Sequence, residues 1–500
     1  MIFLLLLAKV LCFCTEPPKS QLVHSRRLQA PPVEETEFTP ISIYIQYETT
    51  STSQVSKQLQ EDYIPAAVNF YSKVLSVKKT QSKLVPEVSD CLGTELSHRV
   101  KEGVESDVVV IFSYQEKGEY SAWGQVCEVS VDDYMRPLVG KVFLQGQELE
   151  TYTWEQMYAL VVHEIAHILV FNYNLLGYFR GEVGETLGIY NVLGSYVSEY
   201  GETEYIKSEK VLETAKSAFD CYSFQGLNLE TENSGSLFHW EKTLMFNDFM
   251  VADSDIYYVV FSDLSFALFE DSGWYRVNYE YTDSVVWGYK AGCNFVNKPC
   301  FENSLPTSKF FCNSTKASSY CDHTHTFKGM CDLDSSQRVI PLRYQYFSDP
   351  YTAGKDQHLN YCPVVKPFAH GNCKKDAETD KSYGEEVCEN CRCVEGTYGG
   401  NYQAGCHKVT CMGSVATVHV GEEIARCTPE GGPVTVRGYP GYLVCPPSDI
   451  LCRTMHCIEN CHGRGKCLEG KCKCDEGFYG EFCQNSSYTF GVGIILMLLS

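Results

Sequence analysis

The hydrophobic and polar positions in the first part of the chain predict strands mixed with helices. Apolar residues alternate with polar ones in Ile41–Ile45, which is typical of a strand. Apolar residues recur at steps of three and four in Glu61–Val74, which predicts a helix that tolerates Pro65 only in its first turn. The continuous apolar run Val108–Phe112 indicates a buried strand. This order of elements predicts an α+β domain.

A second helix is predicted where an apolar run follows Thr153, because Thr153 and Gln156 have the spacing of a capping box. In this helix His163 and His167 lie one turn apart on the same face, so both imidazoles can reach one metal ion. Glu164 lies beside them, placed to take a proton from metal-bound water. A chance His-Glu-x-x-His sequence in an ordinary helix would have no further ligand elsewhere in the chain, whereas a catalytic zinc site needs a third.

Size and charge narrow the class of protein. A chain of 500 residues with 44% hydrophobic residues can bury more than one core, so we expect two or three domains. The net charge of −22 argues against nucleic acid or an anionic membrane surface as a partner, because like charges repel.

Both ends of the chain have the features of targeting signals. Residues 1–15 have the apolar run of a secretory signal peptide without a preceding positive side chain; the alternative is a mis-assigned start before a soluble protein. Residues 16–40 are polar and contain prolines, which predicts a linker or short pro-segment. Residues 485–500 end in an apolar run about half as long as the ~20 residues of a spanning helix. They indicate a GPI-anchor signal or, alternatively, an incomplete C-terminus.

The 26 cysteines favour an extracellular protein with disulfide bonds. Setting aside Cys12 and Cys14 of the expected signal peptide leaves 24, an even number. Structural zinc sites in a reducing compartment would need two matched Cys-x-x-Cys pairs, but Cys388 and Cys391 form a single such pair.

The cysteine distribution predicts the domain organisation. Cysteines are sparse before residue 290 and dense after it, so we expect one domain over residues 41–280 and a cysteine-rich domain of short strands and loops over residues 281–455. Asn313 begins a glycosylation sequon in the second of these. The last six cysteines resemble an EGF-like module over residues 456–484. This resemblance implies the pairs Cys457–Cys467, Cys461–Cys472 and Cys474–Cys483.

The third metal ligand is absent from the position that follows the helix in the compact metzincin motif. That motif has a glycine three residues after the second histidine and a ligand three residues further on, but Val170 and Tyr173 occupy these positions. The next candidate is His239, which lies 72 positions after His167 and is followed by Met250.

The combination of His-Glu-x-x-His, a distant His239-Trp240 pair and Met250 resembles leishmanolysin, the metzincin surface protease of protozoa. In that family an inserted segment separates the third histidine from the first two. The resemblance implies a metzincin-type catalytic domain, a mixed sheet plus an active-site helix, with an insertion at residues 172–238. It extends over roughly residues 60 to 455, and the supporting stretches are Tyr63–Val68, Asp90-Cys91, Ala122-Trp123, Cys127, Asp271–Tyr275, Trp287-Gly288 and Ala291–Cys293.

The resemblance also implies the roles of the site residues. It makes His163, His167 and His239 the ligands of one zinc ion, Glu164 the general base and Met250 the Met-turn residue beneath the metal. It implies an endopeptidase that cleaves extracellular or surface proteins by attack of metal-activated water on the peptide bond. Its partners would be protein or peptide substrates and, through a C-terminal lipid anchor, the membrane.

Two departures from the family pattern bear on activity and on latency. Val170 replaces a glycine, and a β-branched residue is penalised at positive φ, so the turn must be rebuilt or the helix must run on. No cysteine between Cys14 and Cys91 is present to cap the zinc of a zymogen. The alternative is a weak or inactive metzincin scaffold that serves adhesion or binding. A purely structural surface coat protein would place His239 far from the helix, so convergence of the three imidazoles within about 4 Å decides whether a metal site exists.

Overall fold

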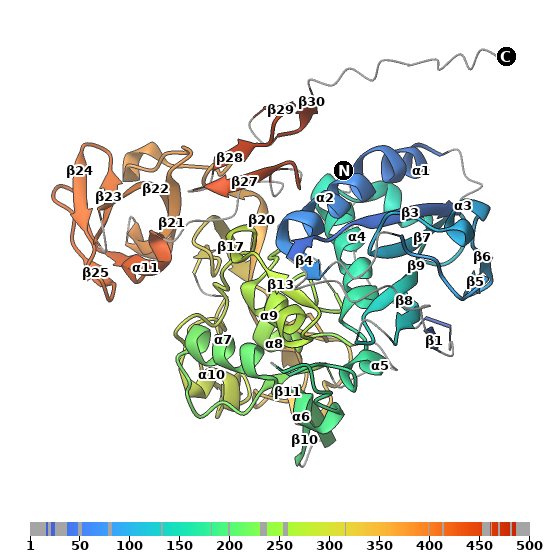
Figure 1. The fold of residues 1–500 in the computed structure, drawn as a ribbon. Coiled ribbons are helices and arrows are strands. Elements are labelled where there is room, and N and C mark those ends of the chain that lie inside the picture. The colour runs from blue at the N-terminus through green and yellow to red at the C-terminus, as the bar shows by residue number, and fades with distance from the viewer. Residues whose placement is uncertain are drawn as a thin grey trace.

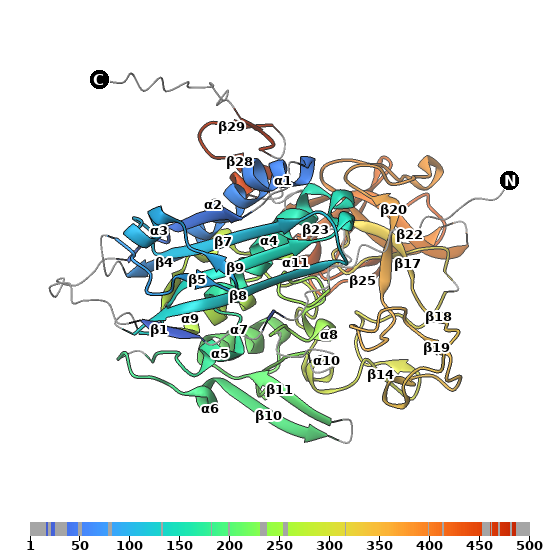
Figure 2. The same ribbon diagram turned by 90° about the vertical axis from the view of Figure 1, so that its right-hand side faces the viewer.

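The computed structural model describes residues 17–18, 22–25, 38–48, 53–78, 83–131, 134–181, 183–198, 201–230, 238–253, 259–315, 317–398, 400–412, 415–452, 461, 463–468, 471–480 and 483–486. Its first half is built on a five-stranded mixed sheet with the order β1-β8-β9-β7-β3 (Figure 1 and Figure 2). β3 (Ile43–Glu48), β7 (Val108–Gln115) and β9 (Pro137–Gln145) are parallel to one another. β8 (Ser121–Ser130) is antiparallel to β9 and parallel to β1 (Val23–Ser25).

Both faces of this sheet are buried. Along β7, Val108, Val110 and Phe112 belong to the largest core, whereas Val109 and Ile111 alternate with them and belong to a smaller core on the other face. The continuous apolar run in the sequence therefore corresponds to a strand covered on both sides.

The helix with the two candidate histidines, α4 (Trp154–Leu169), packs directly on β8 and β9. A Cβ atom at Gly124 of β8 would come within 2.0 Å of the carbonyl oxygen of Glu164. A Cβ atom at Gly140 of β9 would come within 2.4 Å of the side chain of Ile168. These two glycines let the helix approach the sheet closely, which fixes the position of α4.

The predicted elements are present with shifted ends, and the α+β class is confirmed. The strand predicted at Ile41–Ile45 is β3, which begins two residues later. The predicted helix Glu61–Val74 is divided into a π-helical segment, η1 (Leu59–Tyr63), and α2 (Ile64–Val74), with Pro65 in the first turn of α2. Within the segment expected to be a linker, Val23–Ser25 and Phe38–Pro40 form the short strands β1 and β2.

The remaining elements of the first 300 residues are short. The helices are α1 (Gln54–Gln58), α3 (His98–Glu102), η2 (Gln147–Thr151), α5 (Tyr173–Leu176), α6 (Ile189–Val192), α7 (Glu209–Phe219), α8 (Lys242–Met245), α9 (Asp263–Asp271), η3 (Tyr279–Tyr281) and α10 (Cys293–Asn297). The strands are β4 (Leu75–Lys78), β5 (Asp90–Cys91), β6 (Thr94–Glu95), β10 (Leu193–Ser198), β11 (Gly201–Ile206), β12 (Leu227–Asn228) and β13 (Tyr275–Val277).

The cysteine-rich part contains small sheets and one six-stranded sheet, β24-β23-β22-β21-β26-β25, on the side of the molecule opposite β8 and β9 (Figure 1). Its larger strands are β20 (Val365–Asn372), β21 (Cys391–Tyr398), β22 (Asn401–Met412) and β23 (Val415–Val420). The others are β14 (Phe301–Glu302), β15 (Leu305–Pro306), β16 (Tyr320–Cys321), β17 (Phe327–Cys331), β18 (Asp334–Ser335), β19 (Thr352–Ala353), β24 (Glu423–Arg426), β25 (Gly432–Val434) and β26 (Leu443–Cys445), with helices η4 (Leu342–Tyr344), η5 (Lys381–Tyr383) and α11 (Ser448–Leu451).

Disulfides hold this part together because its elements are too short for a large core of their own. Cys388 and Cys391 are joined to each other, which removes them as zinc ligands. The other disulfides up to residue 452 are Cys91–Cys127, Cys221–Cys293, Cys300–Cys362, Cys312–Cys331, Cys321–Cys393, Cys373–Cys406, Cys411–Cys452 and Cys427–Cys445.

The domain boundary near residue 280 stays a prediction. The largest hydrophobic core includes Trp287, Phe310 and Leu359 together with residues of α4.

The EGF-like module consists of two hairpins and lies against α2 (Figure 1). Asn69 of α2 donates a hydrogen bond to the carbonyl of Gly463 at 2.8 Å, and Lys73 pairs with Asp475. The strands are β27 (Gly465–Leu468), β28 (Lys471–Cys474), β29 (Phe478–Tyr479) and β30 (Asn485–Ser486), and the disulfides are Cys461–Cys472 and Cys474–Cys483.

Several expectations fall outside the described residues. They are the signal peptide at residues 1–15, the partner of Cys467 at Cys457, and the apolar tail after residue 486. Within the residues that the structure describes, no helix is long and apolar enough to cross a membrane.

Candidate metal centre

The structure brings the three candidate histidines together in the interior. The Nε2 atoms of His163 and His167 lie 2.9 Å apart, and each lies 3.2 Å from Nε2 of His239. Tetrahedral zinc with Zn–N distances near 2.0–2.1 Å requires ligand nitrogens about 3.3 Å apart. The three nitrogens therefore fit one tetrahedral ion with a fourth position for another ligand.

Helix α4 positions two of the three rings. The side chain of Thr153 accepts a hydrogen bond from the backbone N–H of Gln156 at 3.2 Å, and the Gln156 side chain accepts one from the N–H of Thr153 at 2.9 Å. This capping box starts the helix where the sequence predicts it. The four-residue spacing then puts His163 and His167 on one face, with both side chains buried.

The second ring nitrogens of these two histidines bind backbone carbonyls. Nδ1 of His163 lies 2.5 Å from the carbonyl oxygen of Phe249, and Nδ1 of His167 lies 2.7 Å from that of Phe171. A carbonyl only accepts, so each Nδ1 carries the hydrogen and each Nε2 presents its lone pair. These carbonyls were not identified from the sequence, because a backbone acceptor leaves no signal in residue type.

His239 comes from an irregular segment that precedes α8. Its carbonyl oxygen accepts a hydrogen bond from the backbone N–H of Glu230 at 3.0 Å, and the N–H of Trp240 donates to the carbonyl of Met250 at 3.0 Å. His239 is 1% exposed, and its Nδ1 has no hydrogen-bond partner among the described residues. Among the described residues, hydrogen bonds of the backbone hold this segment in place, and none is made by the His239 ring through Nδ1.

The environment keeps the three imidazoles neutral. Burial, reinforced by the neighbouring His167, lowers the pKa of His163 to about 3, and burial lowers the pKa of His167 to about 4. Burial and the two other imidazoles lower the pKa of His239 well below its usual range. Neutral imidazole is the form that binds a metal ion.

Glu164 and Met250 lie in the same buried region. Glu164 is next to His163 on α4 and is fully buried. Met250 is also fully buried, in a loop whose preceding residue, Phe249, binds His163. The side chain of Asp248 accepts a hydrogen bond from the N–H of Met250 at 2.7 Å, and burial raises the pKa of this carboxyl to about 7. Sequence reasoning assigned no role to Asp248, which closes the turn that contains Met250.

Val170 ends the helix without a positive φ. Helix α4 stops at Leu169, and Val170 adopts φ −155° and ψ −36°. The N–H groups of Val170 and Phe171 both donate to the carbonyl of Ala166 at 2.9 Å. The turn is thus rebuilt without the positive φ that favours glycine, and it delivers the Phe171 carbonyl to His167.

A helix with His-Glu-x-x-His and a third histidine from a distant segment is the ligand arrangement of metallopeptidases. The leishmanolysin family model, peptidase family M8, matches residues 44–460, and an EGF-like domain model matches residues 452–483. The chain therefore belongs to the leishmanolysin family of metallopeptidases, which confirms the resemblance drawn from the sequence.

The chain is similar to curated members of this family along most of its length. Leishmanolysin of Leishmania donovani is 27% identical over 423 residues, which cover 78% of this chain and 69% of that protein. The leishmanolysin-like peptidase of Caenorhabditis briggsae is 25% identical over 73% of this chain and 68% of its own length. That of Drosophila pseudoobscura pseudoobscura is 25% identical over 67% and 61% respectively.

Proposed function

We propose that the protein is a zinc-dependent endopeptidase that cleaves extracellular or surface proteins. The observation that carries this proposal is the convergence of three neutral Nε2 atoms within 3.2 Å of one another, two of them on a helix that also contains Glu164. Three nitrogen ligands with an open fourth position are characteristic of catalytic rather than structural zinc sites.

His163, His167 and His239 would hold the ion, which supplies Lewis acidity that polarises a carbonyl group and acidifies water. The backbone carbonyls of Phe249 and Phe171 orient the first two rings. The loop that contains Met250 supports the site because the Phe249 carbonyl binds His163 and the Asp248 side chain binds the N–H of Met250.

Glu164 acts as the general base and then as the general acid. Its carboxylate accepts a proton from the attacking water and delivers it to the nitrogen of the departing amine. Because Glu164 follows His163 on a capped and tightly packed helix, its position relative to His163 and His167 is fixed. Peptide substrates fit this chemistry, and their sequence preference depends on loops around the site.

The proposal includes a location outside the cell. The many disulfides suit an oxidising environment. A signal peptide at residues 1–15 and a GPI-anchor signal at residues 485–500 would direct the protein to the surface. Release of surface-expressed protein by a phosphatidylinositol-specific phospholipase would support the anchor, and resistance to it would contradict the anchor.

The test of the activity is metal analysis combined with a peptidase assay on the full-length protein. Wild type should contain one zinc ion per chain and cleave an unstructured protein substrate at internal bonds. Glu164→Gln should retain the zinc but lose activity by a factor of at least about 100, the scale of general-base catalysis. Glu155→Gln, a matched change in the first turn of the same helix, should leave activity unchanged. A zinc-loaded wild type without peptidase activity would contradict the proposal and favour a binding scaffold.

A further inference from the structure

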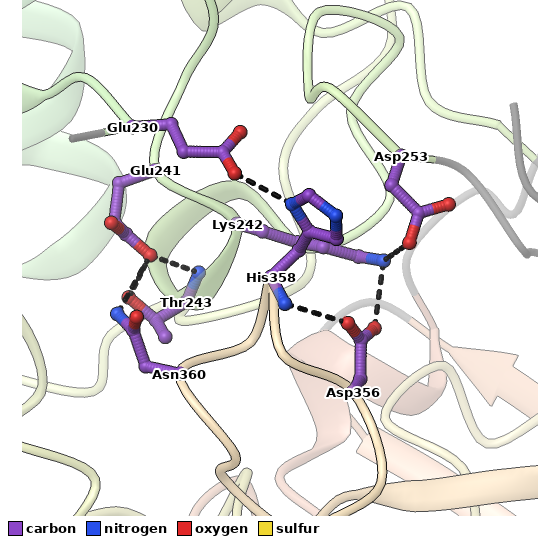
Figure 3. Close-up of polar contacts among 8 residues, drawn as sticks. All are labelled: Glu230, Glu241, Lys242, Thr243, Asp253, Asp356, His358 and Asn360. Atoms are coloured by element: carbon purple, nitrogen blue, oxygen red, sulfur yellow. Dashed lines mark hydrogen bonds and ion pairs between the residues drawn. The ribbon is translucent and has the colours of Figure 1, made fainter. Parts of the chain in front are cut away.

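A cluster of polar and charged side chains joins residues that flank His239 in the sequence to the loop 356–360 (Figure 3). At its centre is Lys242, the first residue of α8, three positions after His239. Its side chain is 1% exposed, and its Nζ lies 3.2 Å from a carboxylate oxygen of Asp253 and 2.8 Å from one of Asp356. A fully buried ammonium group needs such partners, because an uncompensated charge in the interior is strongly unfavourable.

Three residues of the loop 356–360 each bind a different point of the chain around His239. Asp356 binds Lys242. Nδ1 of His358 lies 2.6 Å from Oε1 of Glu230, the residue whose backbone N–H binds the carbonyl of His239. The side-chain amide of Asn360 donates to Oε1 of Glu241 at 3.1 Å. The loop therefore contacts the chain on both sides of His239.

The loop itself is well fixed within the cysteine-rich part. The N–H of His358 donates to Oδ1 of Asp356 at 2.9 Å, and the N–H of Tyr361 donates to the Asp356 carbonyl at 3.0 Å. The next residue, Cys362, is joined by a disulfide to Cys300. A loop that is held in this way can keep the groups that it binds in fixed positions.

His239 is the ligand that depends most on such support. The rings of His163 and His167 lie on a helix, and each binds a backbone carbonyl through Nδ1. His239 lies on irregular backbone and its Nδ1 has no hydrogen-bond partner among the described residues. Outer groups that orient a metal ligand typically change metal affinity by 10–100-fold when they are removed.

We propose that the loop 356–360 of the cysteine-rich part is a clamp that positions His239, so that metal affinity depends on a segment more than 100 residues away in the sequence. Asp356 and Asn360 are positioning residues in this account, because they act through Lys242 and Glu241 on the backbone next to His239. The proposal rests on the zinc site proposed above.

The test measures the zinc affinity of the full-length protein by competition with a chromophoric chelator. The variants are Asp356→Asn, Asn360→Ala and the two combined; Lys242 keeps its contact with Asp253 in all three. The control is Glu385→Gln, which removes the charge from the Lys328–Glu385 pair, also 2.8 Å long, elsewhere in the cysteine-rich part. Thermal unfolding of the metal-free proteins gives the loss of stability in each case, and absorption of the cobalt-substituted proteins reports the geometry of the ligands.

The clamp predicts that the combined variant binds zinc 10–100-fold more weakly and shows an altered cobalt spectrum, whereas the control keeps its affinity within threefold at a comparable loss of stability. Zinc affinity of the combined variant within threefold of wild type would overturn the clamp. So would an equal loss of affinity in the control. A wild type that binds no zinc would instead overturn the proposed function, and the clamp with it.

Discussion

Gly124 of β8 lies directly beneath Glu164 of α4, so close that a Cβ atom at position 124 would come within 2.0 Å of the Glu164 carbonyl oxygen. The neighbour is backbone and has no side-chain freedom with which to move away. The residue proposed as the general base is thus positioned by a glycine in the sheet. Because His163 and His167 share the helix with Glu164, any displacement of α4 moves the ligands as well.

Gly124→Ala should therefore destabilise the fold and weaken zinc binding together. Overpacking of a well-packed interior typically lowers the free energy of unfolding by about 1–3 kcal/mol. Gly177→Ala is a suitable control, since a Cβ atom there would contact nothing within 4 Å. Thermal unfolding with and without zinc measures both effects, and equal unfolding midpoints for the two variants would refute the close packing.

The buried imidazoles of His163 and His167 should contribute stability to the metal-free protein that is lost as the pH falls below about 6.5. The unfolded chain binds protons at its histidines near pH 6.5, whereas burial delays protonation of His167 to about pH 4 and of His163 to about pH 3. Between these values the unfolded state binds more protons, so the free energy of unfolding falls by up to about 1.4 kcal/mol per pH unit for each histidine.

Chelator-treated protein, unfolded thermally from pH 7.5 to 4.5, measures this dependence. His163→Gln should reduce the slope relative to wild type. An identical slope in the variant would mean that this histidine is protonated at the same pH in the folded and unfolded states. Added zinc should raise the unfolding midpoint at neutral pH and lose this effect in acid, because protonated imidazole does not bind the ion.

Asp248 should show the opposite pH dependence. Burial raises its pKa to about 7, above its value in the unfolded chain, so its contribution is greatest in acid and is lost as the pH rises through 7. Asp248→Asn mimics the protonated carboxyl and keeps an acceptor for the N–H of Met250. Relative to wild type, this variant should gain stability between pH 5 and pH 8.

Asp248→Ala provides the comparison, because it removes the acceptor for Met250 and should be destabilised at every pH. This loss should be about 1–3 kcal/mol, the effect of an unsatisfied buried N–H. If the unfolding midpoints of wild type and Asp248→Asn shift in parallel with pH, the carboxyl does not change its ionisation over this range.

Gly463 should be required for the EGF-like module to stay packed against α2. It has φ +62°, and a Cβ atom there would lie 3.0 Å from the Tyr158 hydroxyl and 3.1 Å from the Ala66 carbonyl. Gly463→Val should separate the module from α2 and increase its cleavage in limited proteolysis. Gly438→Ala, at a position with φ +78° and no neighbour within 4 Å, controls for backbone strain alone. Equal protection of the two variants would exclude a tight contact at Gly463.

The sequence was sufficient for the parts of the site that depend on local spacing. The capping box and the four-residue step between His163 and His167 are properties of one helix, so they can be recognised in one segment. His239 could be named only by resemblance, because 72 residues separate it from His167 and no local rule relates the two positions.

Tertiary contacts explain what the sequence did not predict. The clamp from the loop 356–360, the carbonyl partners of the ring nitrogens and the close approach at Gly124 all join segments that are distant in the chain. The effect of Val170 was open as well, because positive φ was a requirement of the family's turn and not of the turn that this chain forms. The boundary near residue 280 that the cysteine density suggests stays a prediction; the largest core contains residues from both sides of this position, among them Trp287.

X-ray absorption at the zinc edge of the purified full-length protein tests the central claim most directly. The account predicts one zinc ion per chain with three imidazole nitrogens at about 2.0–2.1 Å and a fourth ligand atom that is oxygen or nitrogen and not sulfur. In His239→Ala the coordination sphere of the zinc ion should contain one imidazole fewer. A protein that contains no zinc, or a zinc ion bound by sulfur, would contradict the account.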